Sequence, residues 1–295
     1  MFYRRKLILS LLEELGGNLT LTQLQKYLFL ATRIQKSQSF DFVPYRYGCF
    51  SFQANQDIST MIKLGFLSQK NNRVFLEDGK NYYSELSSSD QCVVKEIKYN
   101  FGRIPTKDLI RHIYVKYPFF AIKSTIAEKI LSKDEQRIVC AQNTHFDEQK
   151  LFTLGYEGKS IEHYLNILIK NDIRVLCDVR KNAFSQKYGF SKSQLGKFCS
   201  GLNIKYIHLP ELGIESNMRH NLINQSDYDS LFEYYEKNTL PKRIDCLIKL
   251  RDIISQEGRI ALTCFEQNPK QCHRSKVAEA LMNMKNVDYS FEDIL

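Results

Sequence analysis

The spacing of apolar residues changes near residue 150. Before it, apolar side chains recur at intervals of three or four residues, as within residues 4–15, which is typical of helices that bury one face. After it, short apolar runs alternate with helical patterns. The sequence therefore predicts a mostly helical N-terminal part followed by an α/β part.

Three helical patterns and a hairpin pattern make up the first 76 residues. The helical patterns cover residues 4–15, 24–31 and 58–64, and two strand-like runs flank the Asn71-Asn72 turn within residues 66–76. This order is typical of a winged helix-turn-helix domain. Residues 88–135 are again helical, so we predict a winged-helix-like domain over residues 1–135 and a linker over residues 136–150.

Basic residues of this domain are candidates for contacts with nucleic-acid phosphates. They are Arg46, Lys63, Lys70 and Arg73. Winged helices also serve as protein-interaction modules, in which case Tyr45, Tyr47 and Phe50 would belong to the core or face a partner.

From residue 151 to residue 295 the pattern predicts a Rossmann-like domain. Apolar runs typical of buried strands occur at residues 151–155, 173–180, 204–209 and 259–264, with helical patterns between them. Strands that alternate with helices form a parallel sheet covered on both faces, giving three layers.

Polar side chains follow the ends of these four strands. They are Tyr156, Glu157 and Ser160, then Asp178 and Arg180, then His208 and Glu211, and finally Cys264, Glu266, Cys272, His273 and Arg274. Ligands of such sheets bind beyond the carboxyl ends of the strands. We therefore expect one shared ligand-binding crevice.

The residue types indicate an anionic ligand. Arg180 and Arg274 are candidate anion clamps, since a guanidinium matches phosphate or carboxylate bidentately. Cys272 precedes a helix beside basic residues, a setting that favours thiolate. With Glu266 or Asp178 as proton carrier, these residues are the candidate catalytic set.

Each of these residues also has a purely structural interpretation. Asp178 and Arg180 would simply pair with each other, Cys272 would anchor its loop, and His208 would be a core histidine. Cys264 would be a small, buried hydrophobic residue. Zinc binding by Cys264, Cys272, His273 and His208 is also conceivable, but the Cys-x₇-Cys-His spacing matches none of the usual patterns, so we predict no metal.

Charge and cysteine content indicate the class of partner and the cellular compartment. Residues 1–150 carry 22 Lys and Arg against 15 Asp and Glu, whereas residues 151–295 carry 20 against 18. A basic first half indicates a polyanionic partner. The eight scattered cysteines favour reduced thiols in the cytoplasm, and no apolar run is long enough to span a membrane.

Four motifs in the second half resemble the family called domain of unknown function 488. They are Thr153-Leu-Gly-Tyr-Glu-Gly158, Cys177-Asp-Val-Arg180, His208-Leu-Pro-Glu-Leu-Gly213 and Cys264-Phe-Glu-x-x-Pro-x-x-Cys-His-Arg274. The resemblance covers about residues 151–282, and the first half looks like the winged-helix extension of some members. It implies a Rossmann-like fold and a role around DNA or RNA, with no established reaction.

We therefore expect a nucleic-acid-directed protein whose winged helix binds DNA or RNA and whose crevice recognises or processes a nucleotide or modified base. A non-catalytic module that senses a small anion is the alternative, and a metal-dependent hydrolase is a third. The sequence identifies no cofactor.

Overall fold

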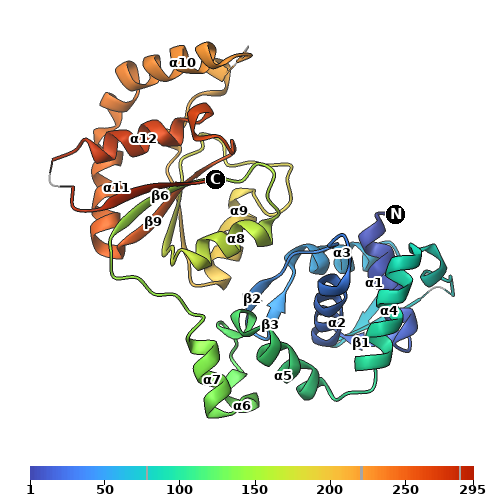
Figure 1. Cartoon of the computed structure of the whole chain (residues 1–295). Coiled ribbons are helices and arrows are strands. Elements are labelled where there is room, and N and C mark those ends of the chain that lie inside the picture. The colour runs from blue at the N-terminus through green and yellow to red at the C-terminus, as the bar shows by residue number, and fades with distance from the viewer. Residues whose placement is uncertain (78, 220–221, 286) are drawn as a thin grey trace. The chain divides into compact units, whose positions relative to one another are not determined.

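The computed structural model describes residues 1–77, 79–219, 222–285 and 287–295, with the side chain of residue 216 left aside. The chain divides into two compact units, Met1–Asn143 and Thr144–Leu295 (Figure 1). The division falls inside the predicted linker of residues 136–150, and helix α7 (Lys133–Cys140) extends into the first part of that linker. Among the described residues, no helix combines the length and apolar character needed to cross a bilayer.

Unit 1 is mostly helical and contains two small sheets. Its helices are α1 (Tyr3–Glu14), α2 (Leu21–Ile34), α3 (Phe52–Lys63), α4 (Ser88–Phe101), α5 (Thr106–Lys116), α6 (Ala127–Ile130) and α7, with 3-10 turns η1 (Tyr83–Glu85) and η2 (Pro118–Ala121). Its strands are β1 (Asn18–Thr20), β2 (Val43–Tyr45), β3 (Gly48–Phe50), β4 (Leu67–Lys70) and β5 (Arg73–Leu76).

Two local signals explain where these elements begin and turn. Thr20 caps α2 in a capping box with Gln23, which satisfies backbone donors that the first helical turn leaves unpaired. Asn71 adopts a φ of 55° between β4 and β5, a conformation that Asn tolerates better than most residues. The strands β1, β5 and β4 form an antiparallel sheet in that order, and β2 pairs with β3.

Unit 2 alternates strands and helices as predicted. Its strands are β6 (Lys150–Gly155), β7 (Val175–Asp178), β8 (Lys205–His208), β9 (Arg259–Cys264) and β10 (Ser290–Ile294). Its helices are α8 (Ile161–Lys170), α9 (Lys192–Gly201), α10 (Gln225–Asn238), α11 (Ile244–Glu257) and α12 (His273–Met282), with 3-10 turns η3 (Pro210–Leu212), η4 (Ser216–Arg219), η5 (Leu240–Arg243) and η6 (Pro269–Gln271).

Within the described residues the strands of unit 2 form a five-stranded parallel sheet in the order β10-β6-β9-β7-β8. Helices α11 and α12 cover one face, and α8 and α9 cover the other (Figure 1). The alternation of side chains along the strands explains both layers: Val175 and Leu262 join the core under α11 and α12, whereas Thr263 faces Tyr164 of α8.

The neighbouring strands β6 and β9 lead into helices on opposite faces of the sheet, α8 and α12. Such a divergence of connections opens a crevice at the carboxyl ends of the two strands. The fold therefore places a binding position between the loop after Gly155 and the loop after Cys264.

Candidate functional site at the carboxyl edge of the sheet

The carboxyl ends of four strands meet in register. Gly155 pairs with Cys264 across β6 and β9, and Asp178 pairs with Thr263 on one side and with His208 on the other. Residues from loops more than a hundred positions apart in the chain therefore lie at one edge of the sheet.

Two glycines allow the loops at this edge to touch backbone to backbone. A Cβ added to Gly155 would lie 1.9 Å from the backbone oxygen of Glu266. A Cβ added to Gly213 would lie 2.1 Å from the backbone nitrogen of Lys181. Both separations are far below van der Waals contact, so only glycine lets these loops approach so closely.

Arg274 holds the loop after β9 from beneath. Its side chain is fully buried and donates hydrogen bonds to the backbone oxygens of Glu266 and Gln267 and to the Thr153 hydroxyl. Glu157 accepts a hydrogen bond of 2.9 Å from the backbone N–H of Gln267 in the same loop. The sequence predicted anion clamping by Arg274, but its guanidinium is inside the protein with its donors directed at the loop.

Asp178 lies at the centre of a buried polar network. It accepts hydrogen bonds from Arg180 Nε at 2.8 Å, from Arg180 Nη2 at 2.5 Å and from the Tyr206 hydroxyl at 2.6 Å. Arg180 in turn donates to the Tyr156 hydroxyl at 2.8 Å, and His208 Nε2 lies 2.9 Å from the backbone oxygen of Arg180. Asp178 and Arg180 therefore pair with each other, which the sequence analysis gave as the alternative to anion binding and catalysis.

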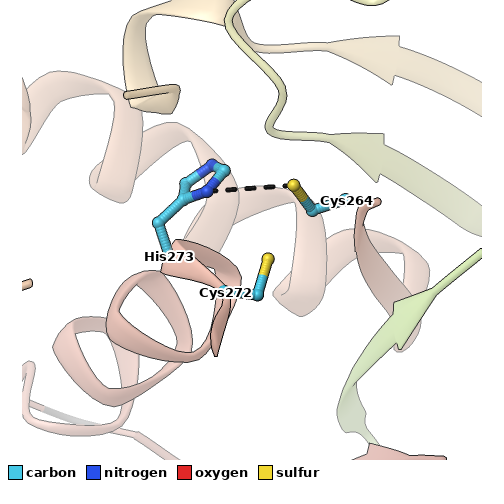
Figure 2. Close-up of side chains that lie close together, drawn as sticks. All are labelled: Cys264, Cys272 and His273. Atoms are coloured by element: carbon cyan, nitrogen blue, oxygen red, sulfur yellow. Dashed lines mark hydrogen bonds between the residues drawn. The ribbon is translucent and has the colours of Figure 1, made fainter. Parts of the chain in front are cut away.

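Two cysteines and a histidine form a second buried group (Figure 2). Cys264 ends β9, Cys272 precedes α12, and His273 is the first residue of α12; all three are buried. The Cys264 sulfur lies 3.8 Å from His273 Nδ1. His273 Nε2 lies 2.9 Å from the backbone oxygen of Val179, which can only accept, so Nε2 carries a proton and Nδ1 faces the sulfur.

Glu266 and Arg219 border this group. The Cys264 thiol contacts Glu266 Oε2 at 3.3 Å. Arg219 reaches both neighbours, with Nη1 at 3.7 Å from Glu266 Oε1 and Nη2 at 3.4 Å from His273 Nδ1. Its side chain is 31% exposed, in contrast to Arg180 and Arg274, so Arg219 is the arginine here that meets solvent.

The pKa values of the two thiols and the imidazole are shifted in different directions. A hydrogen bond from Cys272 lowers the pKa of Cys264 well below its usual value, and the His273 imidazole adds to this effect against the opposing effect of burial. Burial raises the pKa of Cys272 well above its usual value. Burial lowers the pKa of His273, but the Cys264 sulfur outweighs it and the net pKa is raised. The lowered thiol pKa that the sequence predicted for Cys272 therefore falls on Cys264.

A cavity of about 500 Å³ opens above the two groups. Tyr156, Arg180, Arg219, Cys264 and Glu266 line it, together with Lys181, Asn182, Phe184, Ser185, Ile214 and Phe265. A larger hollow of about 670 Å³ lies beside α10 and α12 and reaches Cys272, but five carboxylates border it, those of Asp229, Glu233, Glu236, Glu279 and Asp293. The 500 Å³ cavity is therefore the better match for the anionic ligand that the sequence predicted.

The structure brings most of the predicted site residues of unit 2 together at this edge, but not all. Glu211 borders a different hollow, with Lys242 and Arg243. Ser160 caps α8, where its hydroxyl accepts a hydrogen bond of 3.0 Å from the backbone N–H of His163.

In unit 1, Arg46 shares a cavity of about 230 Å³ with Asn72 of the β4–β5 turn and Asn55 of α3. Lys70 and Arg73 face each other across the end of that hairpin, and Lys63 ends α3.

Sequence reasoning missed several residues of the cavity. Arg219 lies in a segment without a clear periodic pattern, so nothing in the sequence tied it to the site. Phe184 and Phe265 did carry a signal, since each is an aromatic residue in a polar stretch just after a predicted strand. They are 71% and 42% exposed, respectively, at the cavity.

The sequence model of the family described as Domain of unknown function DUF488 matches residues 160–281. The matched range includes Asp178, Arg180, Glu266 and the two cysteines with His273, and it begins after Tyr156 and Glu157. No curated protein of similar sequence was found for this chain.

Proposed function

Because residues 160–281 match the DUF488 family, whose description assigns no function, we propose a function from the geometry of the two units. Unit 1 binds nucleic acid, and the cavity of unit 2 receives a nucleotide or a base. The observation that carries this proposal is the lining of the cavity, where exposed aromatic rings lie beside cationic and amide side chains.

The aromatic side chains of the cavity suit a nucleobase. Phe184 is largely exposed, and the Phe265 ring packs edge-on against Tyr156 with centroids 5.3 Å apart. Stacking of a base on such rings contributes about 1–3 kcal/mol. Arg219 and Asn182 supply hydrogen-bond donors for a phosphate or a base edge. A volume of about 500 Å³ lies in the range of small-molecule sites.

We propose that unit 1 contains a winged helix formed by α1, β1, α2, α3, β4 and β5. The order of these elements and the β1-β5-β4 sheet support this assignment. The β4–β5 hairpin is then the wing, and its exposed Lys70 and Arg73 are positioned for phosphates.

Helix α3 is the element suited to reading bases. Apart from Ile62, its exposed and half-exposed side chains are polar, namely Gln53, Asn55, Gln56, Ser59, Thr60 and Lys63. Amide side chains recognise adenine edges in the major groove. The acidic residue of this helix, Asp57, is buried and pairs with Arg4 and Arg5, which keeps its negative charge away from a polyanion.

Nucleic-acid binding by unit 1 is tested by the anisotropy of fluorescent DNA and RNA oligonucleotides at several salt concentrations, with the full chain. We expect log K to fall linearly with log salt. The double variant Lys70→Gln/Arg73→Gln should reduce the slope by about two, since each B-DNA phosphate contact contributes about 0.9. Lys107→Gln/Lys133→Gln removes the same charge from α5 and α7 and should leave the slope unchanged. A flat salt response, or equal losses in both variants, contradicts this role.

Binding by the cavity is tested separately with mononucleotides and calorimetry. Phe184→Ala should weaken binding about 10-fold through loss of stacking. Tyr234→Ala removes another half-exposed aromatic ring of unit 2, outside this cavity, and serves as the matched control. Affinity that is the same in the two variants contradicts nucleotide binding at this edge.

A further inference from the structure

The geometry points to a zinc site formed by Cys264, Cys272 and His273. The two sulfurs and a ring nitrogen lie within 4.8 Å of one another, and all three residues are buried. Figure 2 shows both sulfurs and the imidazole ring directed toward one another from β9 and the start of α12. This inference concerns the cluster itself and does not rest on nucleotide binding by the cavity.

The spacing of the ligand atoms fits tetrahedral zinc. Bonds of about 2.3 Å to sulfur and about 2.0–2.1 Å to nitrogen place a sulfur and a nitrogen about 3.6 Å apart around the metal. The Cys264 sulfur lies 3.8 Å from His273 Nδ1. Only small side-chain shifts are therefore needed to close the three atoms around an ion.

The hydrogen bond behind His273 is of the kind that supports a metal ligand. Nε2–H donates to the backbone oxygen of Val179 at 2.9 Å, which fixes the ring and leaves the lone pair of Nδ1 directed at Cys264. Histidines that bind metals almost always donate their other N–H to a carbonyl or a carboxylate in this way.

The donor types select zinc over the hard cations. Thiolate and imidazole ligands suit zinc, whereas magnesium and calcium prefer oxygen. Two thiolates balance the charge of Zn²⁺, so a neutral site forms in a buried position. Zinc sites that bind a small molecule keep three protein ligands and a fourth open position. Here Cys264 and Glu266 both line the 500 Å³ cavity, so the fourth position opens toward it.

From the sequence we set zinc aside because the Cys-x₇-Cys-His spacing places two of the ligands next to each other. In the usual zinc patterns each pair of ligands is separated by two to five residues. Cys272 and His273 are consecutive, but an extended residue followed by the first residue of a helix directs their side chains to one point.

Zinc binding is tested on the full chain, first by elemental analysis of the purified protein and then by adding Zn²⁺ or Co²⁺ to chelator-treated protein. We expect one zinc ion per chain and, with Co²⁺, the sulfur-to-metal absorption of a thiolate site. Cys264→Ser and Cys272→Ser should weaken binding by more than the 10–100-fold that loss of a supporting group causes. Cys199→Ser removes a buried cysteine outside the cluster and should bind zinc as the natural chain does.

Folding of each variant is checked by hydrogen exchange of the β9 and α12 peptides. If a serine variant unfolds these peptides, the Co²⁺ spectrum of the unaltered chain decides the question. Three results overturn the proposal. The Co²⁺ protein shows no thiolate absorption, metal binding survives both serine variants, or Cys264 and Cys272 form a disulfide and no metal is taken up.

Discussion

Replacing Asp178 with Asn tests whether this carboxylate stabilises unit 2 through its ion pair with Arg180. The Asp178 side chain is fully buried and neutralises Arg180, whose side chain is 5% exposed. Tyr206 donates to the same carboxylate at 2.6 Å. Asn keeps the shape and one acceptor oxygen but removes the charge, so Arg180 would remain buried without its partner.

The expected loss of stability follows from this burial. Removing one member of a buried ion pair costs about 3–5 kcal/mol. Because Asn still accepts one hydrogen bond, we expect the lower end, about 3 kcal/mol, or roughly 100-fold in the unfolding equilibrium of unit 2. Adding Arg180→Met to Asp178→Asn should cost little more, since the unpaired charge is then gone.

Urea unfolding followed by hydrogen-exchange mass spectrometry measures this loss, because peptides of residues 144–295 report on unit 2 separately from unit 1. Asp134→Asn is the matched control, since Asp134 and its partner Arg137 have side chains 87% and 82% exposed. It should change stability by at most about 0.5 kcal/mol. If the two Asn variants destabilise the chain equally, Asp178 does not hold the site together and the reasoning is refuted.

Three further perturbations test other parts of the structure. Gly155→Ala should destabilise unit 2 by about 1–3 kcal/mol in urea unfolding, because its Cβ would collide with the backbone of Glu266. Gly196→Ala, in α9, meets its nearest neighbour at 3.4 Å and should be tolerated; equal losses would contradict the close approach. Burial lowers the pKa of Lys26, so the folded state binds fewer protons than the unfolded state between that lowered pKa and the usual lysine value of 10.5. The free energy of unfolding should therefore rise with pH in this window, and Lys26→Met should abolish the rise; a slope shared by both proteins would contradict it. Burial raises the pKa of Cys177 to about 12, so an alkylating reagent should label this thiol only on unfolding, as mass spectrometry of the native chain can check.

The sequence predicted four strands of unit 2, β6 to β9, from their apolar runs and missed β10. Strand β9 is buried along its whole length and contains the apolar run Ile260 to Leu262. Strand β10 is an edge strand that carries Glu292 and Asp293, so its pattern does not resemble a strand. Its pairing with β6 adds a Glu292–Lys150 ion pair of 2.8 Å, a contact that no local pattern reveals.

For the candidate site, too, the sequence predicted one part and missed another. The order of strands and helices predicted which loops meet, because parallel strands present their carboxyl ends at one edge. It did not predict the role of each arginine. Arg274 and Arg219 are chemically identical, and only tertiary packing buries the first inside its loop and leaves the second in the cavity. Cys264 was similarly hidden, since a cysteine at the end of a buried strand looks like a core residue until His273 is placed beside it.

The carbonyl group that orients the His273 ring belongs to Val179, and the next residues along the chain, Arg180 to Asn182, line the cavity. A molecule in the cavity that displaced this stretch would turn the imidazole relative to the sulfur of Cys264. The affinity of the cavity for that molecule and the affinity of the Cys264, Cys272 and His273 group for zinc would then be thermodynamically linked.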